Sequence, residues 1–485
     1  MPAEDPAMAQ TAQSRTIETV ENEAQRVFQL QREAYARHPY PSYEERVATL
    51  RKLDRLLADN ADAIAEAIMA DFGHRAYEET LAAEVFITLD GIRDVTKRLK
   101  KWMAPQKRDV SIVFATAKNR VIPMPKGVVG IISPWNYPLF LTLSPLTSVL
   151  AAGNRAMIKM ASNSQNLCRL LADRMREVFP EELVAILPGV RAQDFSTLPY
   201  DHLIFTGSAD AGRTVMRAAA ENLTPVTLEL GGKSPTILCD DFDVEEAASR
   251  ILYAKFLNAG QTCLAPDYLM VPEAKRDAFV AAAKRIMPQR YPDPMSSQYT
   301  SVIDDKSYKR LRATIDDARA KGADVVPLIP NAGFDDQLRK IPPHLVLDVR
   351  DDMVVMQNEI FGPLLPIKTY RALDEVIDYV NAKDRPLGFY LFTNDKVTER
   401  KVLYSTISGG VTINNCMLHV AQHDLPFGGI GASGMGQYHG YEGFLEFSKL
   451  RPVFTNPKLP ILDQFYPPYT GKHRKLLDLL IKYKR

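Results

Sequence analysis

The amino-acid sequence predicts an α/β protein with two doubly wound parallel sheets. From Val128 onward, short runs rich in β-branched residues alternate with helical segments, which is typical of parallel βαβ units with helices on both faces. The length of 485 residues also exceeds what one ordinary core fills, so more than one domain is expected.

The composition is that of a large globular protein without a strong overall charge. Hydrophobic residues make up 46% and charged residues 25% of the chain, and the formal net charge of +1 provides no field that would attract nucleic acid. The four cysteines form no CxxC pair and no Cys/His metal spacing, which argues against disulfides or a bound metal and favours the reducing cytoplasm. They are Cys168, Cys239, Cys263 and Cys416.

Neither the N-terminus nor the longest apolar run has the pattern of a membrane segment. The first ten residues contain acids and no apolar core, so we expect a solvated tail and no export signal. The run from Leu139 to Ala152 is interrupted by polar residues and Pro145, and it is too short to span a bilayer. We expect a buried helix there.

The elements are expected in the following order along the chain. Residues 16 to about 105 have helical periodicity, and the prolines between Arg120 and Gly127 predict an edge strand or an arm at 109–125 with an oligomerisation role. The first sheet takes its strands from 128–132, 156–159, 184–187, 203–206 and 226–230. The second α/β set begins at Pro235, includes a helix at 244–257 and a strand at 268–271, and runs past residue 400. We expect the first sheet to bind ligands beyond the carboxyl ends of its strands.

The C-terminal segment 471–485 has the pattern of a basic amphipathic helix. It could cover a groove on a second subunit or lie on an anionic membrane surface. Membrane contact is the less favoured interpretation, because helix ends rich in lysine are common.

Two glycine-containing segments are candidates for phosphate binding. Gly429 to Gly434 matches G-x-G-x-x-G, but it follows no β-rich run and opens no helix, so we predict a glycine-rich turn. Gly207, Ser208 and Gly212 lie where a strand ends and a helix begins, where free N–H groups and the helix dipole favour a pyrophosphate. The same junction is also compatible with ordinary helix capping.

Three polar residues are candidates for chemistry, each with a structural alternative. Cys263 lies among small and polar residues and is either an inert thiol or a nucleophile. Glu229 is flanked by apolar strand residues, so it either transfers protons or pairs with a cation such as Lys233. Asn136 follows a strand between two prolines, and its amide either donates to an oxyanion or caps the following helix.

Two further groups of residues have weaker signals. Glu359 and Phe361 lie in a turn, where they could bind a sugar hydroxyl and support a flat ring, or simply be surface and core. The histidines His419, His423 and His439 lack the spacing of metal ligands, and we expect them to be structural or exposed.

Six ordered motifs together resemble the aldehyde dehydrogenase superfamily across residues 30 to about 460. They are Pro134–Pro138, Phe205–Ser208, Leu228–Pro235, Gly260–Cys263, Glu359–Pro363 and Pro426–Gly429. The segments Gln261–Tyr268 and Tyr466–Tyr469 are similar to the class 3 branch, and His419–Gly436 is similar to the coniferyl aldehyde dehydrogenase subgroup.

The resemblance implies NAD(P)-dependent oxidation of an aldehyde to a carboxylic acid. The Cys263 thiolate would attack the aldehyde, the Asn136 amide and the Cys263 N–H would stabilise the oxyanion, and Glu229 would activate water to hydrolyse the thioester. Glu359 would hold the nicotinamide ribose and Lys159 the adenosine ribose. The implied cofactor site comprises Trp135, Lys159, Ser162, Gly207, Ser208, Gly212, Leu230, Gly231, Glu359 and Phe361.

We expect the domains and assembly to follow the same family pattern. The cofactor-binding domain would span 15–234, with 418–440 returning to it and 109–125 forming the arm. The catalytic domain would span 235–417, and 441–485 would form an oligomerisation segment and a tail. The resemblance implies a homodimer.

One departure from the family pattern concerns the choice of cofactor. In many NAD-preferring members the segment after the lysine reads Pro-Ser-Glu, whereas here Ser162 stands where the acid is expected. Loss of that charge removes a repulsion of about 1 to 4 kcal/mol against a 2′-phosphate about 4 Å away. The sequence therefore predicts that NADP is accepted alongside NAD.

Two alternative functions remain open at this stage. One is a CoA-acylating or acyl-transferring relative, in which a thiol rather than water takes the acyl group. The other is a catalytically silent structural protein with the same fold. Glu229 favours hydrolysis, and the joint presence of Cys263, Glu229 and Asn136 favours an enzyme. Aromatic aldehydes, including phenylpropenals, or medium-chain aliphatic aldehydes are the expected substrates.

Overall fold

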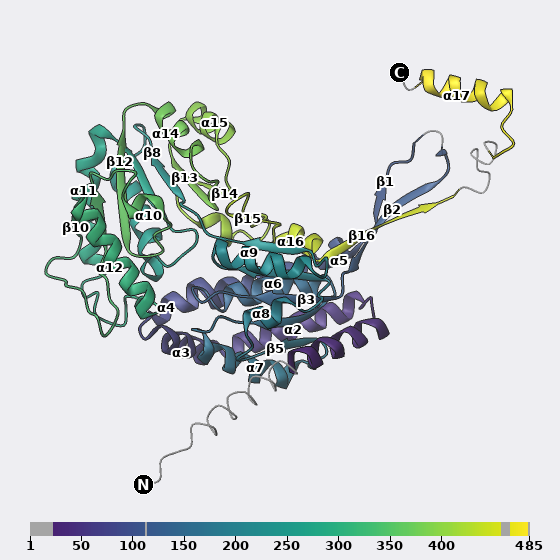
Figure 1. Cartoon of the computed structure of the whole chain (residues 1–485), viewed down its shortest axis with the longest axis horizontal. Helices are drawn as coiled ribbons and strands as arrows, with labels where there is room; N and C mark the ends of the chain where they lie inside the picture. The colour runs from purple at the N-terminus through teal and green to yellow at the C-terminus, as the bar shows by residue number, and fades with distance from the viewer. Residues whose placement is uncertain (1–22, 112–113, 457–465, 484–485) are drawn as a thin grey trace, which may run out of the picture.

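The computed structural model describes residues 23–111, 114–456 and 466–483. Figure 1 shows two α/β lobes that lie beside each other and a narrow sheet that projects from the body. The predicted N-terminal tail lies outside the described residues. Within the described ranges, every helix is either too short or too polar to cross a membrane.

Helices form the first part of the described chain, as their periodicity predicts. A helix over residues 23–37 is followed by α2 (Tyr43–Asp59), α3 (Ala61–Phe72), α4 (Tyr77–Thr80), the π-helical turn η1 (Leu81–Phe86) and α5 (Ile87–Met103). Ser42 and Glu45 form a capping box that starts α2. Both α2 and α5 pack against α6, so these helices cover the first sheet on one face.

The first lobe contains a six-stranded sheet in the order β15-β7-β6-β3-β4-β5. Its strands are β3 (Val128–Ile132), β4 (Arg155–Lys159), β5 (Val184–Ile186), β6 (His202–Thr206), β7 (Val226–Glu229) and β15 (Gly434–Met435). All pairings are parallel except that of β15 with β7. The connecting helices are α6 (Phe140–Ala151), α7 (Gln165–Val178), α8 (Ala192–Ser196) and α9 (Ala209–Ala220).

The course of the chain through this sheet creates a natural binding edge. The chain runs from β3 outward to β4 and β5, and then continues with β6 and β7 on the other side of β3. Loops at the carboxyl ends of β3 and β6 therefore diverge, as they do at the switch points of doubly wound sheets. Helix α6 corresponds to the predicted buried helix, and almost all of its side chains are buried.

The second lobe contains a seven-stranded sheet in the order β10-β11-β12-β9-β8-β13-β14. Its strands are β8 (Pro235–Leu238), β9 (Tyr268–Pro272), β10 (Asp324–Pro327), β11 (His344–Leu347), β12 (Leu364–Tyr370), β13 (Gly388–Phe392) and β14 (Gly410–Ile413), and only β10 runs antiparallel. Its helical segments are α10 (Val244–Phe256), η3 (Leu257–Gly260), η4 (Glu273–Lys275), α11 (Arg276–Arg290), α12 (Asp305–Ala320), α13 (Val354–Gln357), α14 (Leu373–Asn381), α15 (Lys396–Ser405) and η5 (Leu418–Ala421). Two separate apolar clusters are built around this sheet.

The projecting sheet is antiparallel and has the order β1-β2-β16. It consists of β1 (Gln106–Arg108), β2 (Lys118–Pro125) and β16 (Ser448–Thr455), and α16 (Gly440–Glu446) leads into it. Pro123 and Pro125 lie in the half of β2 that pairs only with β16, so their missing N–H groups cost no ladder bond on the other side. The segment 471–483 forms helix α17, as its amphipathic pattern predicts. Two parallel α/β sheets with a small β arm confirm the predicted fold class.

Candidate active site

The predicted site residues lie where the two lobes face each other. In the first sheet, Asn136 follows β3, Lys159 ends β4 and Glu229 ends β7, so all three lie at carboxyl ends of strands. In the second sheet, Cys263 precedes β9 and Glu359 precedes β12, so these residues lie at amino ends. The first sheet therefore contributes to the site from the carboxyl ends of its strands, and the second sheet from the amino ends.

The junction of β6 and α9 leaves a helix N-terminus open to solvent. Ser208 is exposed and caps α9 with its hydroxyl. A Cβ on Gly207 would lie 2.7 Å from Phe205 Cζ, and a Cβ on Gly212 would lie 2.8 Å from Leu230 Cδ2. The N–H groups of Gly207 and Gly212 are used within the protein, by the Glu229 carbonyl at 3.0 Å and the Ser208 carbonyl at 2.9 Å, so an anion would meet the other N–H groups in the first turn of α9. Capping and anion binding are compatible here.

The neighbouring loop after β4 carries no acidic side chain. Lys159 Nζ donates a hydrogen bond to the Met160 carbonyl at 2.9 Å, and burial lowers the pKa of this lysine. Ser162 is exposed, and the next side chain, Asn163, donates to Asp304 at 3.1 Å. The Ser162 side chain is therefore exposed and uncharged, with the Asp304 carboxylate against its neighbour Asn163.

The Glu359 side chain extends from the second lobe and contacts the main chain that follows β7. A Cβ on Gly231 would lie 2.1 Å from Glu359 Oε2, so the carboxylate lies directly on the glycine. Glu359 Oε1 is buried and has no hydrogen-bond partner among the described residues. Burial raises the pKa of Glu359 to about 8, and Asp267 adds to the shift. A buried acceptor without a partner is costly unless a ligand donates to it.

Phe361 and Trp135 bring the two lobes together with their aromatic rings. The ring centroids lie 5.4 Å apart in an edge-to-face arrangement, which is a favourable geometry for aromatic pairs. Phe361 has a φ of +45°, an uncommon backbone conformation for an aromatic residue. The turn that contains it is therefore held by its surroundings.

The G-x-G-x-x-G segment forms a tight turn, as predicted. Gly431, with a φ of +64°, and Gly434 form an isolated β-bridge. The Ser433 carbonyl accepts a hydrogen bond from Leu230 N at 3.0 Å. This turn supports the loop after β7, and no helix begins at its last glycine.

Cys263 opens into a large cavity between the lobes. The cavity has a volume of about 760 Å³, and Cys263 is partly exposed to it, whereas the other three cysteines are buried. The wall is mostly apolar and aromatic, with Ala83, Ile87, Phe140, Leu141, Met417 and Phe427 among its residues. A thiol at the wall of an apolar cavity can attack an electrophile that is bound there.

The electrostatic surroundings of Cys263 favour the protonated thiol. Burial raises the pKa of the thiol to about 12, and the carboxyl groups of Glu359 and Glu229 contribute to the shift. The backbone N–H groups of Cys263 and Leu264 act in the opposite direction. Two inward-pointing N–H groups at the sulfur also provide donors for an oxyanion that forms there.

Glu229 is buried without an ion-pair partner. Its exposed fraction is 2%, and neither carboxylate oxygen has a hydrogen-bond partner among the described residues. Lys233 pairs with Asp267 instead, so the alternative of a Glu229–Lys233 salt bridge is wrong. Burial raises the pKa of Glu229 well above its usual value, and Glu446 adds to the shift. Such a carboxyl can accept a proton near neutral pH.

Asn136 is held by its main chain and does not cap helix α6. The N-cap residue of α6 is Leu139, so the capping alternative is wrong. The Asn136 carbonyl accepts hydrogen bonds from Asn258 Nδ2 at 3.0 Å and from Arg75 Nη1 at 3.3 Å. Because Asn258 also donates to the Gln261 carbonyl at 3.1 Å, one side chain joins the Asn136 loop to the Cys263 loop.

Several residues of the site were missed by sequence reasoning. The Tyr137 hydroxyl lies 2.8 Å from Thr262 Oγ1, and Tyr438 is fully buried with the Glu229 carboxyl and the Cys263 thiol contributing to its raised pKa. Arg75 and Glu84 form a buried ion pair behind the Asn136 loop. Acidic and basic residues among the apolar positions of 72–87 are a signal that could have located this pair.

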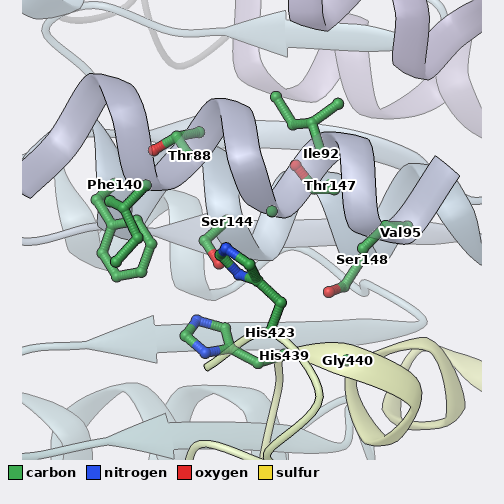
Figure 2. Close-up of a pocket in the computed structure, with 12 residues that line it drawn as sticks. Thr88, Ile92, Val95, Phe140, Ser144, Thr147, Ser148, His423, His439 and Gly440 are labelled. Carbon is green, nitrogen blue, oxygen red and sulfur yellow. The ribbon is translucent and has the colours of Figure 1, made fainter. Parts of the chain in front are cut away.

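His419 and His439 pack beside Phe427, and His423 lies near His439. Figure 2 shows His423 and His439 below helices α5 and α6, at a small cavity of about 20 Å³ with room for one water molecule. His423 Nε2 lies 2.9 Å from Asp90, and His439 stacks on Phe427 with ring centroids 5.3 Å apart. Burial lowers the pKa of His439 to about 3, so the ring is neutral and packs as a core residue.

The fold and the site together define a class of protein. A doubly wound sheet with an open helix N-terminus, a thiol in an apolar cavity and buried carboxyls beside that thiol are the parts of a nucleotide-dependent dehydrogenase that works through cysteine. The model of the aldehyde dehydrogenase family matches residues 1–453, and the chain belongs to this family. It is an NAD(P)-dependent aldehyde dehydrogenase, which oxidises aldehydes to acids.

Named relatives and one solved structure are similar over almost the whole chain. A probable coniferyl aldehyde dehydrogenase of Pseudomonas aeruginosa is 49% identical over 459 residues, which cover 94% of this chain and 96% of that protein. Coniferyl aldehyde dehydrogenase of a Pseudomonas species is 46% identical, with coverage of 84% and 86%. The substrate-bound AldH of Staphylococcus aureus is 34% identical, with a TM-score of 0.88 and coverage of 94% and 99%.

The packing of the Cys263 loop predicts a large cost for a small substitution at Gly260. Gly260 has a φ of +74°, and a Cβ there would lie 2.3 Å from the Gly362 carbonyl oxygen. We expect Gly260→Ala to lower the free energy of unfolding by at least about 3 kcal/mol, because positive φ and a main-chain clash combine. Urea denaturation measures this change.

Gly189 provides the matched control for this substitution. It has a φ of +78°, and a Cβ there would meet nothing within 4 Å. Gly189→Ala should therefore cost only about 1 kcal/mol, the conformational part alone. Equal losses for the two variants would contradict the close packing of the Gly260 and Gly362 loops.

Proposed function

We propose that the chain oxidises an aromatic aldehyde of the coniferyl type, or a medium-chain aliphatic aldehyde, through a thioester on Cys263. The single observation that carries this proposal is the position of the Cys263 thiol at the wall of the large apolar cavity, with the Glu229 carboxyl contributing to its electrostatics. The names of the relatives at 46% and 49% identity support the choice of substrate. Initial rates with a panel of aromatic and aliphatic aldehydes test it.

The chemistry assigned to the residues divides into two stages. The Cys263 thiol loses its proton to water, its sulfur bonds to the aldehyde carbon, and the Asn136 amide and the Cys263 N–H stabilise the resulting oxyanion. A nicotinamide cofactor held beside Glu359 and Phe361 would supply the acceptor for the hydride of this carbon. Glu229 then takes a proton from water, and the hydroxide adds to the thioester carbon. The C–S bond breaks, the carboxylic acid is released, and the proton on Glu229 passes to the Cys263 sulfur.

We assign the cofactor to the residues that the open helix N-terminus and Glu359 bring together. Gly207, Ser208 and Gly212 suit the phosphates, because they lie at the exposed N-terminus of α9, where the helix dipole and the N–H groups of the first turn favour an anion. The partnerless oxygen of Glu359 suits a ribose hydroxyl. The assigned cofactor site consists of Trp135, Lys159, Ser162, Gly207, Ser208, Gly212, Leu230, Gly231, Glu359 and Phe361.

The uncharged loop at Ser162 predicts dual cofactor use. We expect kcat/KM with NADP to lie within about tenfold of that with NAD, because no carboxylate on residues 159–164 repels a 2′-phosphate. Ser162→Glu should lower kcat/KM with NADP by at least about tenfold while NAD use is kept or improved. A strong NAD preference in the wild type would contradict this prediction.

The role assigned to Glu229 predicts a separation of the two stages. Glu229→Gln should release one burst of reduced cofactor per Cys263 and then turn over at least about a hundredfold more slowly, because the thioester forms but water is not activated. Stopped-flow absorbance of the reduced cofactor measures the burst. Cys263→Ala should abolish the burst.

The same variant distinguishes hydrolysis from transfer to a thiol. Undiminished steady-state turnover in Glu229→Gln would contradict the role in activating water. If added coenzyme A raised steady-state turnover in both the wild type and Glu229→Gln, the acyl-transferring alternative would be favoured. A catalytically silent protein is not favoured by the family match.

We propose that the chain divides into a cofactor-binding domain at 15–234, joined by 418–440, and a catalytic domain at 235–417. The pairing of β15 with β7 supports the return of 418–440 to the first lobe.

We further propose that 441–485 and the 109–125 arm form the contacts of a homodimer, and that the enzyme works in the reducing cytoplasm. Strand β16 has one unpaired edge among the described strands, and Phe454 on it is 51% exposed. Phe454→Asp, which places a charge on this exposed part of β16, should therefore convert a dimer to monomers in sedimentation velocity, and a wild-type monomer would contradict this assembly.

A further inference from the structure

A chain of four polar side chains runs through the first lobe. Lys126 Nζ, between β2 and β3, lies 3.0 Å from His202 Nδ1 on β6. His202 Nε2 lies 2.8 Å from Thr227 Oγ1 on β7, and the Thr227 hydroxyl donates to Glu446 Oε1 at 2.5 Å. Glu446 is the last residue of α16, and its side chain is 25% exposed. The proposed reaction uses none of these four residues.

The donors in this chain all point toward Glu446. An ammonium group only donates hydrogen bonds, so His202 Nδ1 accepts from Lys126. Burial lowers the pKa of His202 well below its usual value, so the ring is neutral and Nε2 carries its proton. Nε2 then donates to Thr227, which leaves the Thr227 hydroxyl to donate to Glu446. The hydroxyl is thus oriented to hold a carboxylate, which only accepts hydrogen bonds.

This last hydrogen bond fixes the Glu446 carboxylate on the same side of β7 as Glu229. Thr227 and Glu229 are two residues apart on β7, so their side chains project from the same face of the sheet. Gly436 has a φ of +78°, and a Cβ there would lie 2.7 Å from Glu446 Oε1 and 2.9 Å from Thr227 Oγ1. A side chain at Gly436 would therefore displace the carboxylate from this position.

The charge of Glu446 is not neutralised by a cation in direct contact. Among the described residues, the only basic side chain within 4 Å of its carboxylate is neutral His202, at 3.7 Å. Lys126 is bonded to the opposite nitrogen of His202, and Lys449 acts on Lys126. The negative charge of Glu446 therefore acts on the neighbouring part of β7.

The other titratable groups around Glu229 are neutral near neutral pH. Burial raises the pKa of the Tyr438 hydroxyl well above its usual value and the pKa of the Cys263 thiol to about 12. During hydrolysis the sulfur is part of a thioester and carries no charge. Burial is the main cause of the raised pKa of Glu229, and Glu446 is the charged residue that adds to it.

We propose that Glu446 is a positioning residue for hydrolysis of the thioester, because its fixed charge beside Glu229 makes Glu229 a stronger base toward water. This inference rests on the proposed function, in which Glu229 activates the hydrolytic water. A like charge nearby favours the protonated form of a carboxyl, so Glu229 takes a proton more readily. The same charge moves the ionisation of Glu229 to higher pH, and its loss should move that ionisation to lower pH.

The pH dependence of acyl-enzyme hydrolysis tests this role. Cys263 is acetylated with p-nitrophenyl acetate, and loss of the acetyl group is followed by rapid quench and intact-mass measurement between about pH 5 and 9. The rate constant should rise with pH in the wild type as Glu229 ionises. Glu446→Gln keeps an acceptor for Thr227 but removes the charge. The midpoint of the rise should fall by at least about 0.5 pH unit and the plateau rate by about threefold.

Two further variants provide matched controls. Glu442 lies one turn earlier on α16 and is also partly exposed, but it does not contribute to the pKa of Glu229. Glu442→Gln should therefore leave the midpoint unchanged. Glu446→Asp keeps the charge and should hold the midpoint closer to the wild-type value than Glu446→Gln does. An equal shift in Glu442→Gln would assign the effect to the general charge of α16 and overturn the inference.

The remaining outcomes separate this inference from the proposed function. Slower hydrolysis in Glu446→Gln with the wild-type midpoint would indicate a structural role and overturn the inference, while the role of Glu229 stays intact. Hydrolysis in Glu229→Gln with the rate and pH profile of the wild type would overturn the proposed function instead. If Glu446→Gln does not fold, Thr227→Val removes the hydroxyl that holds the carboxylate and should lower the midpoint. An unchanged midpoint in that variant would decide against the inference.

Discussion

A fully buried ion pair between Arg75 and Glu84 fixes the loop on which the first half of the site depends. Glu84 Oε1 lies 2.8 Å from Arg75 Nη1, and Glu84 Oε2 accepts hydrogen bonds from the N–H groups of Leu139 at 2.7 Å and Phe140 at 3.2 Å. A carboxylate from η1 therefore satisfies the free N–H groups at the start of α6. Removal of one partner would leave a buried charge, which costs about 3–5 kcal/mol.

Polar side chains connect this ion pair to the second lobe. Arg75 and Asn258 both donate to the Asn136 carbonyl, and Asn258 belongs to the turn that precedes Cys263. Tyr137 adds a second link to this turn through Thr262. The Cys263 thiol and the Asn136 loop come from different sheets, and these few buried hydrogen bonds fix their relative position.

The sequence predicted those features that arise from local pattern. Alternating strands and helices, the buried helix α6 and the strand-rich arm follow from periodicity and proline placement, which act over a few residues. The pairing of Lys233 with Asp267 rather than Glu229, and the capping of α6 by Glu84 rather than Asn136, could not be predicted in the same way. In both cases the partner lies more than thirty residues away in the chain, and only the tertiary fold brings it into contact. The orientation of the second sheet, which presents the amino ends of its strands to the site, also depends on the tertiary fold.

Burial has opposite effects on the two groups that carry the proposed chemistry. The low-polarity surroundings raise the pKa of Cys263 to about 12, which opposes formation of the thiolate. The same surroundings raise the pKa of Glu229, which turns an ordinary carboxylate into a base able to take a proton near neutral pH. Because a negative charge on one group raises the pKa of the other, the thiolate and the Glu229 carboxylate disfavour each other. The two stages therefore need opposite charge states: Cys263 ionises most readily while Glu229 is protonated, and Glu229 acts as a base once the sulfur is bound as a neutral thioester.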